Sequence, residues 1–222
     1  MENRYSLFHN TMLQLQEEGV LSEIILIGGW CPFIYTFMFE ESDYIPQLRT
    51  ADIDILIPNP NSISIYADLP SVFSKLGYEE ILNYPSGHSH FSHPDLDIEF
   101  LISEKGKPRT TPYDLKNLKV KALGLTYLEM LVENTLLVQL PDFEIRVPRP
   151  AAYVLHKLLL AQRRKDTKKR RKDLQTGNEL GEFLISDPGL RQDLIMIYKT
   201  FPASWKSDIR KSASDEISNL LE

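Results

Sequence analysis

The chain has 222 residues, with 25 Lys and Arg against 31 Asp and Glu, so its formal net charge at pH 7 is −6. Charged residues make up 25% and hydrophobic residues 42% of the chain, a composition that argues against intrinsic disorder. The negative net charge also argues against a surface that is basic throughout and coats nucleic acid. At roughly 100–200 residues per domain, the length predicts one large domain or one domain with an appended lobe.

Cysteine content and hydropathy bear on the compartment. The single cysteine, Cys31, cannot form an internal disulfide bond, so nothing indicates an oxidising environment. The first residues lack the basic start and apolar run of a signal peptide. The longest stretch without charge, residues 24–39, is interrupted by glycine and proline and is shorter than the ~20 apolar residues of a membrane span. We therefore expect a cytoplasmic protein with no membrane partner.

The first part of the chain predicts helices and strands in mixed order. Alternating or short apolar runs indicate strands, and helical spacing that ends at Gly or Pro indicates helices. The expected elements are a helix over 5–18, a strand over Ile24–Ile27, a helix over Trp30–Phe39, a strand over Asp52–Ile57, a helix over Tyr66–Leu76, a strand over Tyr78–Leu82, a turn at 85–87, a strand over Asp95–Ile102, a helix over Thr126–Val132, and a hairpin of Leu136–Leu140 with Phe143–Val147.

After Arg149-Pro150 the pattern becomes helical. The expected helices cover Ala151–Gln162, Lys168–Leu184, Asp187–Tyr198 and Ser204–Leu221. This change predicts a boundary near residue 148, with a mixed α/β domain over 1–148 and a helical lobe over 149–222.

Two expected strands carry acids on one face and apolar residues on the other. In the first strand Asp52 and Asp54 point away from the isoleucines, with Cα atoms about 6–7 Å apart. Such carboxylates repel each other unless a cation lies between them, and oxygen ligands suit Mg²⁺ or Mn²⁺. Residues 95–101 repeat the pattern with Asp95, Asp97 and Glu99. The alternative is that both acid faces are merely solvated strand surfaces.

A third feature is the strand Ile24–Ile27, which ends at Gly28-Gly29. Two glycines between a strand and a helix let backbone N–H groups approach phosphate oxygens closely. The alternative is a tight turn that needs a positive φ. The pair lacks the third glycine of a dinucleotide-binding fingerprint and the Lys-Ser/Thr of a P-loop.

Together these features resemble the polymerase-β-like nucleotidyltransferase superfamily. Its members have a strand that ends in Gly-Gly or Gly-Ser, an Asp-x-Asp strand some tens of residues later, and a third acid on a later strand. The spacing of 23 residues from Gly29 to Asp52, with Arg49-Thr50 before the acids, is similar to minimal bacterial nucleotidyltransferases and abortive-infection toxins. The resemblance implies an α/β (α+β) domain with a mixed β-sheet, followed by a C-terminal helical lobe.

The resemblance also implies roles for individual residues. The catalytic acids and metal ligands would be Asp52, Asp54 and Asp97, with Glu99 as the alternative third acid. The nucleotide-binding residues would be Gly28, Gly29, Thr50 and Lys157. Trp30 stands where the family often has a small or hydroxyl-bearing residue.

The implied reaction is attack by a hydroxyl group on the α-phosphorus of an NTP, with release of pyrophosphate and with Mg²⁺ or Mn²⁺ as cofactor. The acceptor would be RNA, a protein or a small molecule. Alternatives are a catalytically inactive relative that binds nucleotide or a partner protein, the toxin of a toxin–antitoxin pair, and an unrelated α/β binding module.

Two further segments have more than one interpretation. His88, His90 and His93 suggest either a transition-metal site or a polar strand lining the acceptor cleft, and no cysteine at zinc-site spacing follows. Residues 163–173 carry eight Lys and Arg against two Asp, a local charge of +6, so the remainder carries −12. That block is either a solvated helix face or a contact for the phosphates of NTP or RNA.

Overall fold

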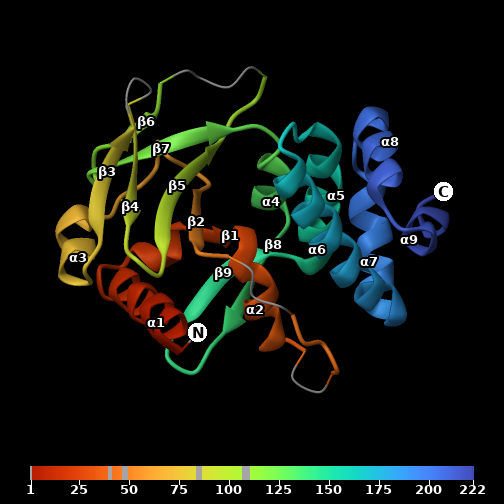
Figure 1. Cartoon of the computed structure of the whole chain (residues 1–222), viewed down its shortest axis with the longest axis horizontal. Helices are drawn as coiled ribbons and strands as arrows, with labels where there is room; N and C mark the ends of the chain where they lie inside the picture. Colours follow the sequence, from red (N-terminus) through yellow and green to blue (C-terminus); the bar gives the residue numbers. More distant parts are fainter. Residues whose placement is uncertain (1, 40–41, 47–49, 84–86, 107–110) are drawn as a thin grey trace. The chain divides into compact units, whose positions relative to one another are not determined.

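The computed structural model describes residues 2–39, 42–46, 50–83, 87–106 and 111–222. The chain divides into two compact units, Met1–Pro148 and Arg149–Glu222, whose elements are labelled in Figure 1. Arg49 and most of the turn expected at residues 85–87 lie outside the described residues. Among the helices described, none combines the length and the apolar character needed to cross a lipid bilayer.

The first unit is built on a sheet in which the described residues form seven strands. These are β1 (Ile25–Ile27), β2 (Asp52–Ile57), β3 (Glu79–Asn83), β4 (His88–Ser92), β5 (Asp97–Ser103), β6 (Tyr113–Leu115) and β7 (Val120–Leu125). The main order is β1-β2-β5-β4-β3, with β7 pairing with β5 and with β6. The β2–β5 and β5–β7 pairs are parallel and the remaining pairs are antiparallel, so the sheet is mixed.

Helices and a hairpin complete the first unit. They are α1 (Glu2–Glu17), the 3₁₀ turns η1 (Val20–Glu23) and η2 (Gly28–Trp30), α2 (Cys31–Thr36), α3 (Leu69–Lys75), α4 (Glu129–Glu133), and the hairpin of β8 (Thr135–Gln139) with β9 (Glu144–Pro148). Figure 1 shows α3 beside β3, at one end of the sheet. Phe8 of α1 stacks on Trp30 with ring centroids 4.0 Å apart, which fixes the strand–helix connection after β1.

Alternation in the strands determines which sheet face is buried. Ile53 and Ile55 of β2 are fully buried and lie on the same face as Phe100 of β5. Phe73 of α3 covers this face, with its ring centroid 4.8 Å from that of Phe91 and 6.2 Å from that of Phe100. Because the apolar core lies on this side, the acidic residues between the isoleucines are on the opposite face.

The second unit is helical. Its helices are α5 (Pro150–Arg163), α6 (Thr167–Ser186), α7 (Pro188–Lys199), α8 (Ala203–Ser212) and α9 (Asp215–Leu220). Helix α5 is buried on most sides because it packs against α6, α7 and α8. It begins at Pro150, where the missing backbone N–H costs no intrahelical hydrogen bond. A mixed sheet followed by helices confirms the α+β class expected from the sequence.

The single helix predicted over Ser204–Leu221 is wrong, because the chain turns between α8 and α9. Ala213 and Ser214 have extended backbone conformations. Asn178 of α6 supplies the hydrogen bonds that a continuous helix would make there: its Nδ2 donates to the carbonyl of Ser212 at 3.1 Å, and its Oδ1 accepts from the N–H of Ser214 at 2.7 Å. A side chain distant in sequence therefore ends α8.

Two other expectations need correction, and two strands were not expected. The helix expected from Tyr66 begins only at Leu69, because the Asp68 carboxylate accepts a hydrogen bond from the N–H of Ser71 and caps the first turn. The helix expected over Trp30–Phe39 ends at Thr36. Strands β6 and β7 were not predicted, since their side chains mix polar and apolar residues without a clear alternation over β6.

Candidate active site

The acid-bearing strands β2 and β5 are parallel neighbours. Their register pairs Asp52 with Asp97, and Asp54 with Glu99. Residues paired across adjacent strands point to the same face, with strands ~4.8 Å apart. Four carboxylates from two separate segments of the chain therefore line the same face. We call these four residues the acidic face.

The acidic face is open at the start of the two strands and closed at their ends. Asp52 is exposed, whereas Asp54 is half-buried. The next residues along the same face, Leu56 and Leu101, are buried. The carboxylates are therefore at least partly accessible to solvent, and buried leucines follow them on the same face. Like charges on one face of adjacent strands repel one another, and a cation beside them would reduce that repulsion.

The twin glycines lie directly against this face. Ile27, the last residue of β1, pairs with Asp54 across the antiparallel ladder. Gly28 follows with φ +75°, and a Cβ built there would lie 1.8 Å from Asp54 Oδ2. A Cβ on Gly29 would lie 2.5 Å from the Cβ of Thr50. Neither position has room for a side chain, and Gly28 also has a backbone conformation that glycine alone adopts readily.

Thr50 connects the glycines to the start of β2. Its side chain is buried, and its hydroxyl accepts a hydrogen bond from the N–H of Asp52 at 3.2 Å and donates to the carbonyl of Asp52 at 3.4 Å. The residue therefore holds the backbone from which the first acid projects. Thr50 is expected to bind the nucleotide, and the contacts described for its hydroxyl are with the backbone of Asp52.

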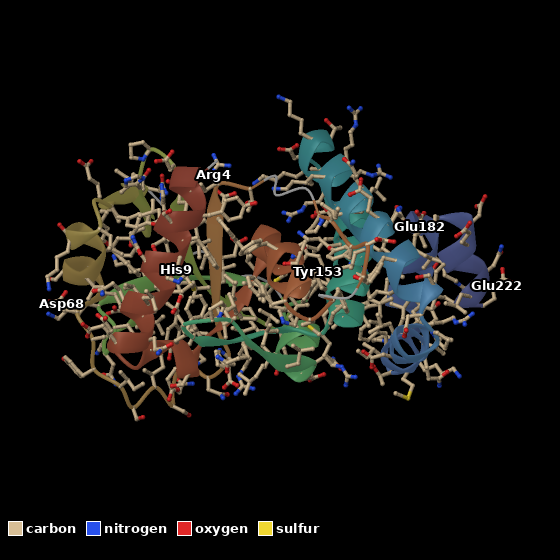
Figure 2. The ribbon with its side chains drawn as sticks, turned by 90° about the horizontal axis from the view of Figure 1, so that it is seen from below. Arg4, His9, Asp68, Tyr153, Glu182 and Glu222 are labelled. Carbon is tan, nitrogen blue, oxygen red and sulfur yellow. The ribbon has the colours of Figure 1, made fainter. Side chains whose placement is uncertain are left out.

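Arg4 is a residue of this site that sequence reasoning missed. It lies on α1, as Figure 2 shows, and its guanidinium donates to the carbonyls of Thr50 at 3.3 Å and Asp95 at 3.1 Å. These two carbonyls lie in the segments that lead into β2 and β5. One planar cation with several donors therefore links the starts of both acid-bearing strands. No local pattern around residue 4 indicates these long-range contacts.

Strand β4 continues the acidic face on the other side of β5. Ser92 pairs with Asp97, and His88 Nε2 lies 3.9 Å from Glu99 Oε1. Burial lowers the pKa of His88, and the neighbouring Glu99 carboxylate opposes that shift. Of the three histidines predicted to lie on a polar strand, His88 and His90 are on β4 beside the acids, and His93 follows the end of the strand.

A preformed metal centre is absent from the part of the chain that the structure describes. No three His, Cys, Asp or Glu side chains there gather into a group that could hold a metal ion. This finding applies to the histidines of β4 and equally to the acidic face. The carboxylates share a face and a register, but they are not drawn together around a common point.

Lys157 lies on α5, in the helical unit. Its Nζ is 2.9 Å from Asp173 Oδ1, and Arg164 Nε is 3.0 Å from the other oxygen of the same carboxylate. Asp173 is almost fully buried, and these two cations hold its pKa below the usual value against the opposing effect of burial. The ion pair between Lys157 and Asp173 therefore joins α5 to α6.

Comparisons with known proteins bear on the family of the chain. A family model described as "Nucleotidyltransferase" matches residues 7–192. No curated protein sequence matches the chain significantly. A solved structure entitled "Crystal structure of an antigenic nucleotidyltransferase-like protein from Paracoccidioides brasiliensis" has 14% sequence identity and a TM-score of 0.44, with 92% of each chain covered. That score is too low to support the assignment, but the family model spans most of the chain, which therefore belongs to the nucleotidyltransferase family.

Proposed function

We propose that the protein transfers a nucleoside monophosphate from an NTP to a hydroxyl group and releases pyrophosphate, with Mg²⁺ or Mn²⁺ as cofactor. Membership of the family supports the transferase class. The observation that carries the finer proposal is the parallel register of β2 and β5, which places Asp52 beside Asp97 and Asp54 beside Glu99.

The acidic face suits a hard divalent cation in its donor atoms. Carboxylate oxygens are preferred ligands of Mg²⁺ and Mn²⁺. We propose Asp52, Asp54 and Asp97 as the ligands, and Glu99 as the alternative third acid because its neighbour is His88. Since these side chains do not already form a group of three, phosphate oxygens of the nucleotide would complete the coordination. When bound, the cation would neutralise charge that develops on the phosphates during transfer.

The chain's own groups would position the reactants. Backbone N–H groups at Gly28-Gly29 are candidates to bind the phosphates, because the two glycines carry no side chain of their own there. Thr50 and Arg4 would act indirectly, by fixing the starts of the acid-bearing strands. Lys157 remains a candidate phosphate contact, and to act as one it would have to share or exchange its partner Asp173.

A labelling assay on the isosteric variant Asp54→Asn tests the proposal. The change keeps the shape of the side chain against Gly28 but removes its charge, so we expect the fold to survive. Loss of one metal-ligating carboxylate removes several kcal/mol of transition-state stabilisation, so transfer should fall by roughly a thousandfold. The measurement is transfer of label from each α-³²P-labelled NTP to acceptors in a cell extract, with added Mg²⁺ or Mn²⁺.

Asp114→Asn is the matched control, because Asp114 is an exposed aspartate on β6 of the same sheet. It should label acceptors at the wild-type rate. An Asp54→Asn protein that is folded by circular dichroism and transfers label as fast as the control would disprove the proposed site.

A further inference from the structure

The end of α5 and the start of α6 form a strongly basic surface in an otherwise acidic chain. We call residues 163–173 the basic corner; it has a net charge of +6, against −12 for the rest of the protein. Residues 163–171 are exposed, and Lys172 is half-buried. The proposed chemistry at the acidic face does not use this surface.

Most of the cations in the basic corner form no ion pair with a residue that the structure describes. Arg163 pairs with Asp208 at 2.6 Å, and Arg164 pairs with Asp173. The other local acid, Asp166, accepts hydrogen bonds from the backbone N–H groups of Lys168 and Lys169 as the N-cap of α6. Within the described residues, five cations therefore have no ion pair. They are Lys165, Lys168, Lys169, Arg170 and Arg171.

The stability of the helix does not account for this placement. The first turn of a helix carries the positive end of the backbone dipole, so cations there are unfavourable. Five consecutive cations, at residues 168–172, also repel one another, and those at 168–171 have no ion pair with a described residue. A bound polyanion would remove both penalties.

The geometry of the cations narrows the class of polyanion. Successive helical residues are turned by about 100°, so four consecutive cations surround the helix end instead of forming a stripe on one side. A ligand that satisfies them presents anionic groups on more than one side, as the two phosphate backbones of a nucleic-acid duplex do. The basic corner has no Phe, Tyr or Trp, so it offers no platform for stacking unpaired bases.

We propose that the basic corner binds the phosphate backbone of base-paired RNA. This inference rests on the proposed function in one respect: RNA would then be the class of acceptor, since each of its nucleotides carries a hydroxyl group that DNA lacks. Binding itself needs neither nucleotide nor metal.

The test compares two triple variants with the same change of charge. Lys168→Gln, Arg170→Gln and Arg171→Gln together remove three unpaired cations of the basic corner. Lys199→Gln, Arg210→Gln and Lys211→Gln, on α7 and α8 of the same unit, form the matched control. Because cations oppose the dipole at the start of α6, the first triple variant should not weaken the helix, and circular dichroism checks this.

The readout is fluorescence anisotropy of a labelled RNA hairpin across a KCl series, without NTP or divalent metal. We expect the first triple variant to bind at least tenfold more weakly than wild type at low salt, and the control to bind as wild type does. If each removed cation contacts one phosphate, the slope of log K against log [KCl] should fall by about 2 to 3.

Three results would overturn the inference: no binding by the wild type, an equal loss in both triple variants, or equally tight binding of a DNA hairpin of the same sequence. Because the assay contains no nucleotide and no metal, such a result leaves the transfer assay on Asp54→Asn unaffected. Failure of that transfer assay would in turn leave RNA binding standing as a separate property.

Discussion

A close approach between an acid and a glycine shapes the candidate site. Asp54 lies so near the Cα of Gly28 that no Cβ fits between them. The contact sets the direction of the carboxylate at the point where β1 ends beside β2. Glycine is therefore needed at residue 28 for two reasons, the positive φ and the position of Asp54.

A comparison of Gly28→Ala with Gly87→Ala separates the effect of the positive φ from the effect of the contact with Asp54. Gly87 has φ +72° but nothing within 4 Å of the added Cβ, whereas at Gly28 the Cβ would collide with Asp54. Both variants incur roughly 1–2 kcal/mol for a left-handed alanine. We expect Gly28→Ala to lose additional free energy of unfolding in urea titrations, and to lose transfer activity because Asp54 is displaced.

Gly87→Ala should lose stability only. The opposite result would be equal free energies of unfolding for the two variants and full transfer activity in Gly28→Ala. It would show that the position of the Asp54 carboxylate does not depend on its contact with Gly28.

Residues with local patterns were predictable, and residues with distant partners were not. Asp52 and Asp54 stand out because they alternate with isoleucines, so their common face follows from strand geometry alone. Arg4 acts on carbonyls 46 and 91 residues away. Lys157 fits a family pattern, but its ion pair with Asp173 depends on how α5 packs against α6.

At the scale of elements, the strength of the sequence pattern determined how well each element was predicted. β2 matches its predicted bounds, Asp52–Ile57, because its alternation is strict. β5 begins two residues after the predicted start, at Asp97. The turn between α8 and α9 could not be predicted, because Asn178 of another helix supplies its hydrogen bonds.

Helix α5 carries a buried histidine that should make the helical unit sensitive to acid. Burial, helped by the charge of Lys157, lowers the pKa of His156 to about 3, while Asp173 opposes the shift. The unfolded chain has an ordinary histidine pKa of about 6.5. Below that pH, His156 binds a proton in the unfolded state but stays neutral in the folded state. The free energy of unfolding therefore falls as the pH decreases.

The variant His156→Leu should remove this dependence. Between pH 7 and pH 5, the stability of the wild type should fall relative to that of the variant by up to about 2 kcal/mol. The measurement is urea unfolding followed by circular dichroism at both pH values, in which contributions of the other titrating groups cancel in the difference. A difference that stays the same at both pH values would contradict a neutral buried His156.

For the whole molecule, charge is distributed unevenly along the chain. The basic corner opposes the acidity of the remainder, and the acidic face adds four carboxylates on two adjacent strands. Such a chain attracts cations to one region and polyanions to another. The two features belong to different compact units, so each is tested by its own variants.

The acidic face is proposed to hold a divalent cation together with a nucleotide. The most direct test is Mn²⁺ titration by electron paramagnetic resonance, with and without non-hydrolysable analogues of the four NTPs. Because the described side chains form no preassembled group of three, Mn²⁺ should bind weakly alone and at least tenfold more tightly with the preferred analogue. In Asp54→Asn the analogue should no longer increase the affinity for Mn²⁺, whereas in Asp114→Asn it should increase the affinity as in the wild type. Two results would contradict metal binding at the acidic face together with a nucleotide. One is an affinity for Mn²⁺ that no analogue increases, and the other is an affinity that is the same in Asp54→Asn and in the wild type.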